Sequence, residues 1–361
     1  MPSIKDKKIR KLRYSEAIRE GIDQAMSENQ DLIVIGEGVP DPKSIFETTK
    51  GLQEKFGKSR VFDMPLSENG VTGICIGAAL NGTPVLMIHQ RIDFSLLAMD
   101  QIINNAAKWH YMFNGQSTVP IVIRVIVGRG WGQGPQHSQN LQALFAHIPG
   151  LKVITPATAK DAKGMMVAAL KDKNPVIFIE HRWLHHIEDS VPEEMYFSEL
   201  DKAQILRQGS DVTIVANSLM TIETMKAAAV LSEIGVNVEV VDLRSIKPID
   251  LDTILKSVSK TKKMIVVDSA WKTGGISGEV VSLVVEHGLD LLECAPLRVT
   301  SPDHPVPTSH YLADEYYKDA RQISLSVLDF LNMQDKAKSI SNKFTSTDPI
   351  DVPNRDFHGP F

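Results

Sequence analysis

The sequence predicts an α/β protein built from two doubly wound, mainly parallel sheets. Short apolar runs of strand length alternate with longer segments of helical periodicity, which is typical of βαβ units. A polar connector at residues 187–199, carrying Asp, Glu, Ser and Pro, separates two such series. With 361 residues and 43% hydrophobic content, the chain is long enough for two or three domains with sizeable cores.

The pattern places each element of the two series in order. In the first series the predicted strands are 32–35, 60–63, 84–88, 121–127, 152–155 and 176–180, and the predicted helices are 14–27, 44–56, 67–81, 94–112, 138–146 and 159–171. In the second, the strands are 211–216, 237–242, 263–268 and 297–299, and the helices are 221–234, 251–259, 278–286 and 317–331. We therefore expect domains at 10–190 and 200–331. The polar tail 332–361 lacks sustained periodicity, so we expect it to be disordered or laid over a partner.

Composition narrows the functional class. A net charge of −5 and a pI near 6.1 argue against nucleic-acid binding. The cysteines, Cys75 and Cys294, are far apart among apolar or small neighbours, which fits a reducing compartment. No run of eighteen apolar residues predicts a membrane span. We expect a cytoplasmic protein, with a short organellar presequence as the alternative.

One carboxylate has an unusual setting. The segment 64–70 reads Met-Pro-Leu-Ser-Glu-Asn-Gly and places Glu68 in the first turn of a nearly all-apolar helix. A carboxyl group held in such dry surroundings can exchange protons during catalysis. The plainer interpretation is that Ser67 caps the helix and Glu68 complements the positive end of its dipole.

Motifs elsewhere favour the catalytic interpretation. They are Gly36-Glu37, Asp93-Phe94-Ser95, the glycine loop 128–136 with His137-Ser138-Gln139, Pro149-Gly150-Leu151-Lys152-Val153, and Asp161-Ala162-Lys163-Gly164. In order and spacing, over residues 10–331, the chain resembles the beta subunit of the thiamine-diphosphate-dependent 2-oxoacid dehydrogenases, which include pyruvate, branched-chain and acetoin dehydrogenases. The resemblance implies a transketolase-like pyrimidine-binding domain followed by a transketolase C-terminal-like domain.

The resemblance also implies roles for individual residues. Glu68 matches the glutamate that shares a proton with the cofactor's pyrimidine ring and thereby activates the cofactor. Phe94 matches the aromatic residue that stacks on this ring, although a core Phe is the alternative. Glu37 matches a further carboxylate near the cofactor. His137 matches a histidine of the active-site mouth, and we expect it to open the helix at 138, where the helix dipole favours a neutral imidazole.

Two metal sites follow from the same resemblance. In the family the alpha subunit holds Mg²⁺ and the cofactor's diphosphate, and this chain indeed lacks a Gly-Asp-Gly…Asn motif. A potassium site formed by backbone carbonyls matches Ile121, Ala169, Asp172 and Asn174. An ordinary helix-ending turn before Pro175 explains Ala169, Asp172 and Asn174 nearly as well.

Other motif readings fit less well. The glycine loop 128–134 has its third glycine misplaced for dinucleotide binding, and Lys272-Thr273-Gly274-Gly275 reverses the order of a phosphate loop. His181, His185 and His186 follow a strand and lack the spacing of a helical zinc motif, so a role in the active-site mouth or at an interface is favoured over a metal.

We therefore expect a beta subunit that pairs with an alpha subunit as an α2β2 heterotetramer. The reaction would be decarboxylation of a 2-oxoacid and transfer of the acyl group to the lipoyl arm of an acyltransferase. The segments 40–43 and 89–92 are more polar than usual in this family, which leaves the substrate open. Two alternatives therefore remain: a split transketolase-like carboligase acting on an aldehyde, and a non-catalytic scaffold.

Overall fold

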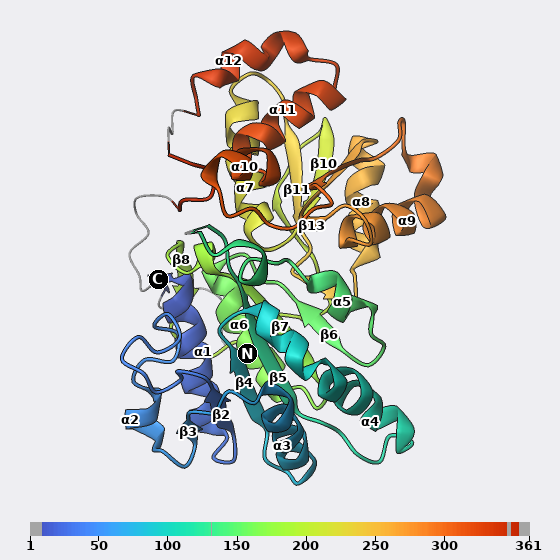
Figure 1. Ribbon diagram of the computed structural model, residues 1–361. Helices are drawn as coiled ribbons and strands as arrows, with labels where there is room; N and C mark the ends of the chain where they lie inside the picture. Colours follow the sequence, from blue (N-terminus) through green and yellow to red (C-terminus); the bar gives the residue numbers. More distant parts are fainter. Residues whose placement is uncertain (1–8, 131, 345–347, 354–361) are drawn as a thin grey trace. The chain divides into compact units, whose positions relative to one another are not determined.

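The computed structural model describes residues 9–130, 132–344 and 348–353. The described residues divide into two compact units, one formed by residues 9–128 and 144–200 and the other by residues 129–143 and 201–353. Figure 1 labels many of the helices and strands of both units along the chain. No helix in the described ranges is long and apolar enough to cross a membrane.

The first unit is organised around a parallel sheet with strand order β6-β7-β5-β4-β2-β3. Its strands are β2 (Ile33–Gly36), β3 (Val61–Phe62), β4 (Val85–His89), β5 (Ile121–Val127), β6 (Lys152–Ile154) and β7 (Val176–His181). Every residue of β4, β5 and β7 is buried, as expected of parallel strands covered on both faces. Outside this sheet, β1 (Ile9–Arg13) pairs antiparallel with β8 (Glu188–Pro192).

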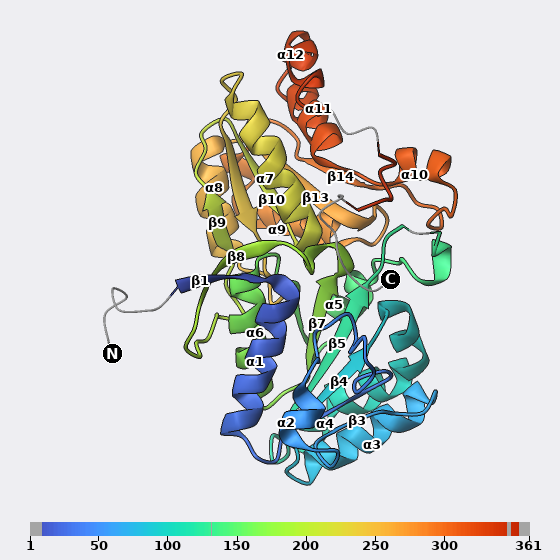
Figure 2. The same ribbon diagram turned by 90° about the vertical axis from the view of Figure 1, so that its left-hand side faces the viewer.

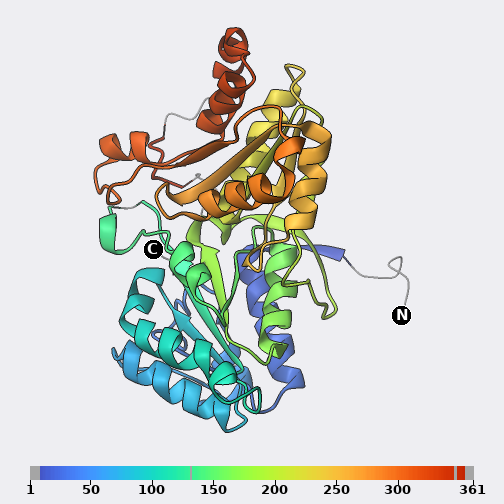
Figure 3. The same cartoon turned by 90° about the vertical axis from the view of Figure 1, so that its right-hand side faces the viewer.

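Helices cover both faces of this sheet. They are α1 (Tyr14–Glu28), α2 (Leu52–Phe56), α3 (Glu68–Leu80), the 3-10 helix η2 (Ile92–Ala98), the π-helix η3 (Gln101–Ala106), α4 (Ala107–Met112), α6 (Ala159–Lys171) and the 3-10 helix η5 (Arg182–Leu184). Helices α1 and α6 lie side by side (Figure 2). Helix α3 packs against η2 and η3 on the opposite face (Figure 3). The short helix α5 (Gln142–His147) begins in the second unit's range 129–143 and continues into the first unit's range 144–200.

The second unit has a mixed sheet with strand order β14-β13-β10-β11-β9, in which only β9 is antiparallel. Its strands are β9 (Gln204–Arg207), β10 (Val212–Ala216), β11 (Val238–Asp242), β13 (Met264–Trp271) and β14 (Leu297–Ser301), and a short strand β12 spans Ser245–Lys247. Its helices are η4 (Gly134–Gln136), α7 (Ser218–Ser232), α8 (Leu251–Thr261), α9 (Ile276–Gly288), η6 (Leu289–Leu291), α10 (His310–Tyr316), α11 (Ala320–Phe330), η7 (Gln334–Lys336) and α12 (Ala337–Ser341). Helix α7 packs against α11, and α8 packs against α9. Figure 1 shows these two pairs on opposite sides of the strands, which confirms the predicted α/β class.

Two predicted helices of the first unit were wrong in part. Only Leu52–Phe56 of the predicted helix 44–56 is helical, because Ser44, Ile45, Phe46 and Glu47 all have φ between +43° and +67°. The predicted helix 94–112 is instead a succession of 3-10, π and α segments. Such π segments occur often at functional sites.

The tail 332–361, expected to be disordered or laid over a partner, is ordered over part of its length. Helix α12 buries Ile340, and the Lys336 ammonium group donates to the backbone oxygen of Ile234, 3.0 Å away. Further along, Asp351 is 2% exposed and its carboxylate lies 2.6 Å from His310 Nδ1. The tail therefore packs on the chain's own second unit at these points.

Candidate functional site

The carboxyl ends of the parallel strands gather the predicted cofactor residues of the first unit. Strands β2, β3 and β4 run in the same direction, so the residues that follow them lie at one edge of the sheet. Glu37 follows β2, Glu68 begins the helix after β3, and Phe94 follows β4. This edge is where open α/β sheets bind their ligands.

Three carboxylates lie together at this edge. Burial, followed by the negative charges of Glu68 and Asp63, raises the pKa of Glu37 above its ordinary value. Asp63 is held in place because its Oδ1 accepts hydrogen bonds from the backbone N–H groups of Gly38 and Met64, both at 2.9 Å. Sequence reasoning did not single out Asp63, although its place at the end of a predicted strand was a usable signal.

Glu68 lies at the first turn of α3 and is 8% exposed. Ser67 is at the N-cap position but its side chain forms no cap hydrogen bond, which counts against the plainer interpretation that Ser67 caps this helix. Val71, Cys75 and Ile76, further along this helix, are all buried, and the hydroxyl of the buried Thr72 donates to the backbone oxygen of Glu68 at 2.6 Å. Burial there raises the pKa of the Cys75 thiol to about 12. The Glu68 carboxylate forms no hydrogen bond or ion pair with any described residue.

Phe94 lies in η2, against which α3 packs. It is half-buried, and its backbone N–H donates to the backbone oxygen of Arg91 at 3.2 Å. Gln90, in the same connection, donates from Nε2 to the backbone oxygen of Glu37 at 2.9 Å. The segment that carries Phe94 is therefore tied to the loop that carries Glu37, and Gln90 is a positioning residue that sequence reasoning did not identify.

His137 belongs to the second unit and is described with it. It follows the 3-10 helix Gly134–Gln136, while the next α-helix begins only at Gln142. The prediction that His137 opens a helix was therefore wrong, and the helix-dipole argument for a neutral imidazole does not hold. Its place in the active-site mouth stays a prediction.

The glycine loop before His137 is held by the C-terminal segment. Gly130 has φ +79°, and a Cβ at this position would lie 1.6 Å from the backbone oxygen of Asp351. Arg129 donates to the backbone oxygen of Ile350 at 2.7 Å, and its guanidinium carbon lies 4.2 Å from the Tyr317 ring centroid. A side chain at position 130 is therefore incompatible with this packing.

The four predicted potassium residues lie at the start of β5, in the last turn of α6 and in the turn between α6 and β7. Ile121 begins β5, and Val122 pairs with Val176, two residues after Asn174. The backbone oxygen of Ala169 accepts from the N–H of Asp172 at 3.1 Å, and Asp172 Oδ1 accepts from the N–H of Asn174 at 2.9 Å. The helix-ending turn is thus present. Potassium binding by these carbonyls stays a prediction.

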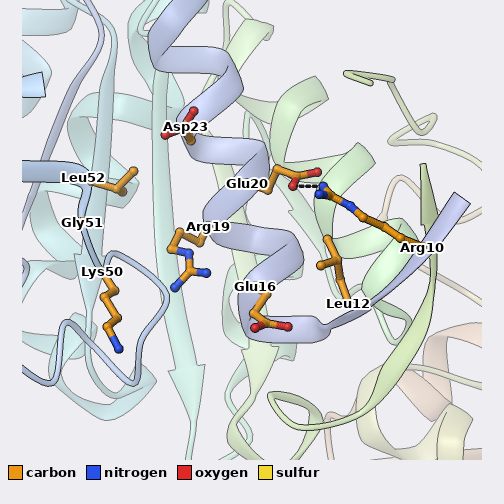
Figure 4. Close-up of a pocket in the computed structure, with 9 residues that line it drawn as sticks. All are labelled: Arg10, Leu12, Glu16, Arg19, Glu20, Asp23, Lys50, Gly51 and Leu52. Atoms are coloured by element: carbon orange, nitrogen blue, oxygen red, sulfur yellow. Dashed lines mark hydrogen bonds and ion pairs between the residues drawn. The ribbon is translucent and has the colours of Figure 1, made fainter. Parts of the chain in front are cut away.

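The first unit also has a cavity with charged walls, and none of the predicted cofactor residues lines it. A cavity of about 350 Å³ lies beside α1 (Figure 4) and is lined by Arg10, Leu12, Glu16, Arg19, Glu20, Asp23, Lys50, Gly51 and Leu52. Among the described residues no cluster of three or more His, Cys, Asp and Glu side chains could hold a metal ion.

Comparison with known proteins places the chain in a family. Residues 10–186 match the transketolase pyrimidine-binding domain and residues 201–323 the transketolase C-terminal domain. The chain is 41% identical over 325 residues to the beta subunit of acetoin:2,6-dichlorophenolindophenol oxidoreductase from Cupriavidus necator, covering 87% of this chain and 96% of that protein. It is 40% identical over 292 residues to the pyruvate dehydrogenase E1 component subunit beta of Gracilaria tenuistipitata var. liui, covering 81% and 90% respectively.

A solved structure has the same fold. It is described as a split gene transketolase in an inactive beta4 tetramer, superposes with a TM-score of 0.72 at 22% identity, and covers 90% of this chain and 99% of that chain. This likeness confirms the predicted fold, while the two domain matches and the relatives confirm the predicted family and both predicted domain types. The chain belongs to the beta subunits of the thiamine-diphosphate-dependent 2-oxoacid dehydrogenases, a transketolase-like family.

Proposed function

We propose that this chain binds the pyrimidine half of thiamine diphosphate at the carboxylate edge of its first sheet and, with an alpha subunit, decarboxylates a 2-oxoacid. The observation that carries this proposal is the unpartnered Glu68 carboxylate at the first turn of α3, beside the helix that bears Phe94. The relatives' names favour neither the carboligase nor the scaffold alternative.

The residues present fit the pyrimidine ring. Glu37 Oε1 is buried without a hydrogen-bond partner among the described residues, and Glu68 likewise has none, so both carboxylates are available to a group that shares protons. Glu68 would hold a proton at the ring nitrogen, Glu37 would keep the local charge negative, and Phe94 would stack on the ring. When bound, thiamine diphosphate supplies the nucleophilic carbon that attacks the 2-oxoacid carbonyl.

The exposed surface near these residues supports a partner chain. Leu66, Ile74 and Leu97, which lie before α3, on α3 and on η2, are 83%, 69% and 64% exposed. Helix α3 packs against η2, and exposed apolar side chains on neighbouring elements commonly mark protein interfaces. We propose that an alpha subunit covers them in an α2β2 heterotetramer and supplies the Mg²⁺ and diphosphate site that this sequence lacks.

Three finer points remain parts of the proposal. The acyl acceptor is the lipoyl arm of an acyltransferase, and His137 lies where that arm enters. K⁺ binds the carbonyls of Ile121, Ala169, Asp172 and Asn174. The enzyme works in the cytoplasm.

Activity of the assembled enzyme tests the proposal. The chain is co-expressed with an alpha chain that carries the Gly-Asp-Gly…Asn motif, and the purified complex is screened with 2-oxoacids, thiamine diphosphate, Mg²⁺ and an artificial electron acceptor. We expect cofactor-dependent reduction of the acceptor with at least one 2-oxoacid. A stable complex that decarboxylates none of them, but transfers a two-carbon unit between sugars, would replace the proposal with the carboligase alternative.

A further inference from the structure

A second charged group at the carboxyl edge consists of arginines. Arg91 follows β4 and Arg182 follows β7, and they are 7% and 1% exposed. Their guanidinium carbons lie 5.1 and 4.2 Å from the centroid of the Phe46 ring, so one ring contacts both groups. Burial first, then the charge of Arg91, lowers the pKa of Arg182 to about 9. Two buried cations therefore share a small volume.

The buried carboxylates of this region form no ion pair with Arg91, although the charge of Asp93 partly opposes the lowering of the Arg91 pKa by burial. Glu180 Oε2 accepts from Arg124 Nε at 3.0 Å, while Oε1 accepts from Arg124 Nη2 at 2.5 Å and lies 2.8 Å from His185 Nε2. Arg91 donates to the backbone oxygen of Gln90 at 2.8 Å but forms no ion pair with any described residue. Its Nε is buried without a hydrogen-bond partner in the described part of the chain.

A guanidinium group buried in this way is costly unless an anion accompanies it. Removing a charge from water carries a penalty of several kcal/mol that only a paired counter-ion offsets. The Phe46 ring can hold the cation by its face, but it accepts no conventional hydrogen bond from the in-plane N–H groups. Those N–H groups match the oxygens of a carboxylate or a phosphate.

The arginine pair is connected to the cofactor residues. The backbone oxygen of Arg91 accepts from Phe94 N–H at 3.2 Å, and the neighbouring Gln90 bonds the backbone of Glu37. Glu37, Asp63 and Glu68 follow β2 and β3, whereas Arg91 and Arg182 follow β4 and β7, with Asp93 two residues after Arg91. The carboxylates favour a cationic group and repel an anionic one, so an anion is directed to Arg91.

We propose that Arg91, together with Arg182 and the Phe46 ring, binds an oxyanion group at the end of the substrate remote from the reacting carbonyl. This inference rests on the proposed function for the position of the reacting end. The anion is either a second carboxylate of the 2-oxoacid or a phosphate ester, and the two are told apart by their probes.

Binding of simple anions tests the site without catalysis. The thermal midpoint of the full chain is measured with inorganic phosphate, with glutarate and with chloride at equal ionic strength. The variant is Arg91→Met, which keeps the apolar stem length and removes a buried guanidinium that forms no ion pair with a described residue, so we expect it to stay folded. Arg321→Met is the matched control, because Arg321 is exposed on α11 in the second unit.

We expect phosphate or glutarate to raise the midpoint of the wild-type chain and of Arg321→Met, but not that of Arg91→Met. Arg91→Lys, which keeps the charge and loses the planar fork, should respond more weakly than wild type. A response to phosphate alone identifies a phosphate ester, and a response to glutarate identifies a dicarboxylic 2-oxoacid. No response of the wild-type chain to either anion, or an equal response in Arg91→Met, overturns the inference.

Kinetics of the complex with its alpha subunit separate this inference from the proposed function. The quantity measured is the ratio of the specificity constants for 2-oxoglutarate and for its 5-amide, which is uncharged at the remote end. This ratio should fall on the order of tenfold or more in Arg91→Met and stay unchanged in Arg321→Met. If no 2-oxoacid is decarboxylated while the anion response still depends on Arg91, the proposed function fails and the anion site stands. Decarboxylation without any Arg91-dependent anion effect refutes the site alone.

Discussion

Replacing Glu68 by Gln should stop proton exchange without disturbing the fold. Glutamine has nearly the same shape, and the Glu68 carboxylate forms no hydrogen bond or ion pair with a described residue that the change could break. Loss of a proton-transfer group lowers turnover on the order of a hundredfold or more. That factor corresponds to about 2.7 kcal/mol of transition-state stabilisation.

The same substitution has a defined effect on stability. Because burial and the charges of Glu68 and Asp63 raise the pKa of Glu37, the folded chain binds this proton more tightly than the unfolded chain does. That contribution to stability is fully present below the ordinary pKa of 4.5 and is lost as the pH rises through the raised value. Glu68→Gln removes one of the charges that raise the pKa of Glu37. As the pH rises from 4.5 through that pKa, the variant should therefore lose less stability than the wild-type chain.

Two measurements check this prediction. Turnover of the assembled enzyme is followed with an artificial electron acceptor, and the free energy of unfolding of the chain is measured in urea from pH 4 to pH 8. Glu54→Gln, at an exposed position of α2, is the matched control and should change neither quantity. Wild-type turnover in Glu68→Gln would refute the catalytic role, and a large loss of stability would show that Glu68 is structural.

Three further predictions concern assembly and packing. Calorimetry of the isolated chain should show weak binding of thiamine diphosphate that becomes tight and Mg²⁺-dependent only with the alpha subunit; tight binding by this chain alone would contradict it. Glu180→Gln should destabilise the chain by about 3–5 kcal/mol in urea unfolding because Arg124 then lacks its carboxylate, and adding Arg124→Met should restore most of that loss. Gly130→Ala should lower the thermal midpoint more than Gly235→Ala, since both glycines have φ near +78° but only position 130 has a backbone oxygen in the way, that of Asp351. Equal effects of the two alanines would mean that the C-terminal segment does not press on position 130.

The parallel strands could be predicted because burial on both faces produces continuous apolar runs. Strands β5 and β7 are fully buried and lie within a residue of the predicted ranges. Glu68 could be placed for a similar reason, since a Ser-Glu pair before an apolar helix marks the helix start. The local sequence is sufficient to predict a strand or a helix end wherever the residues of that element themselves specify it.

The remaining features depend on contacts between distant segments. Residues 44–47 have ordinary helical composition, but the Phe46 ring lies against Arg91 and Arg182, and the turn adopts left-handed conformations. His137 is followed by irregular backbone rather than a helix, in a loop that the C-terminal segment contacts. The grouping of Asp63 with Glu37 arises only once β2 and β3 are paired. Neither propensity nor periodicity encodes such long-range contacts.

The contact between Gly130 and Asp351 also orders events during synthesis. The residues that hold the glycine loop lie more than two hundred positions further along the chain, within the last described segment. Domains fold as they emerge from the ribosome, N-terminal parts first. The first sheet can therefore form early, whereas the loop before His137 reaches its final form only after Ile350 and Asp351 have been synthesised. A nascent chain that does not yet include Ile350 thus has the carboxyl end of the first sheet, with Glu68, but lacks the contacts that hold the glycine loop before His137.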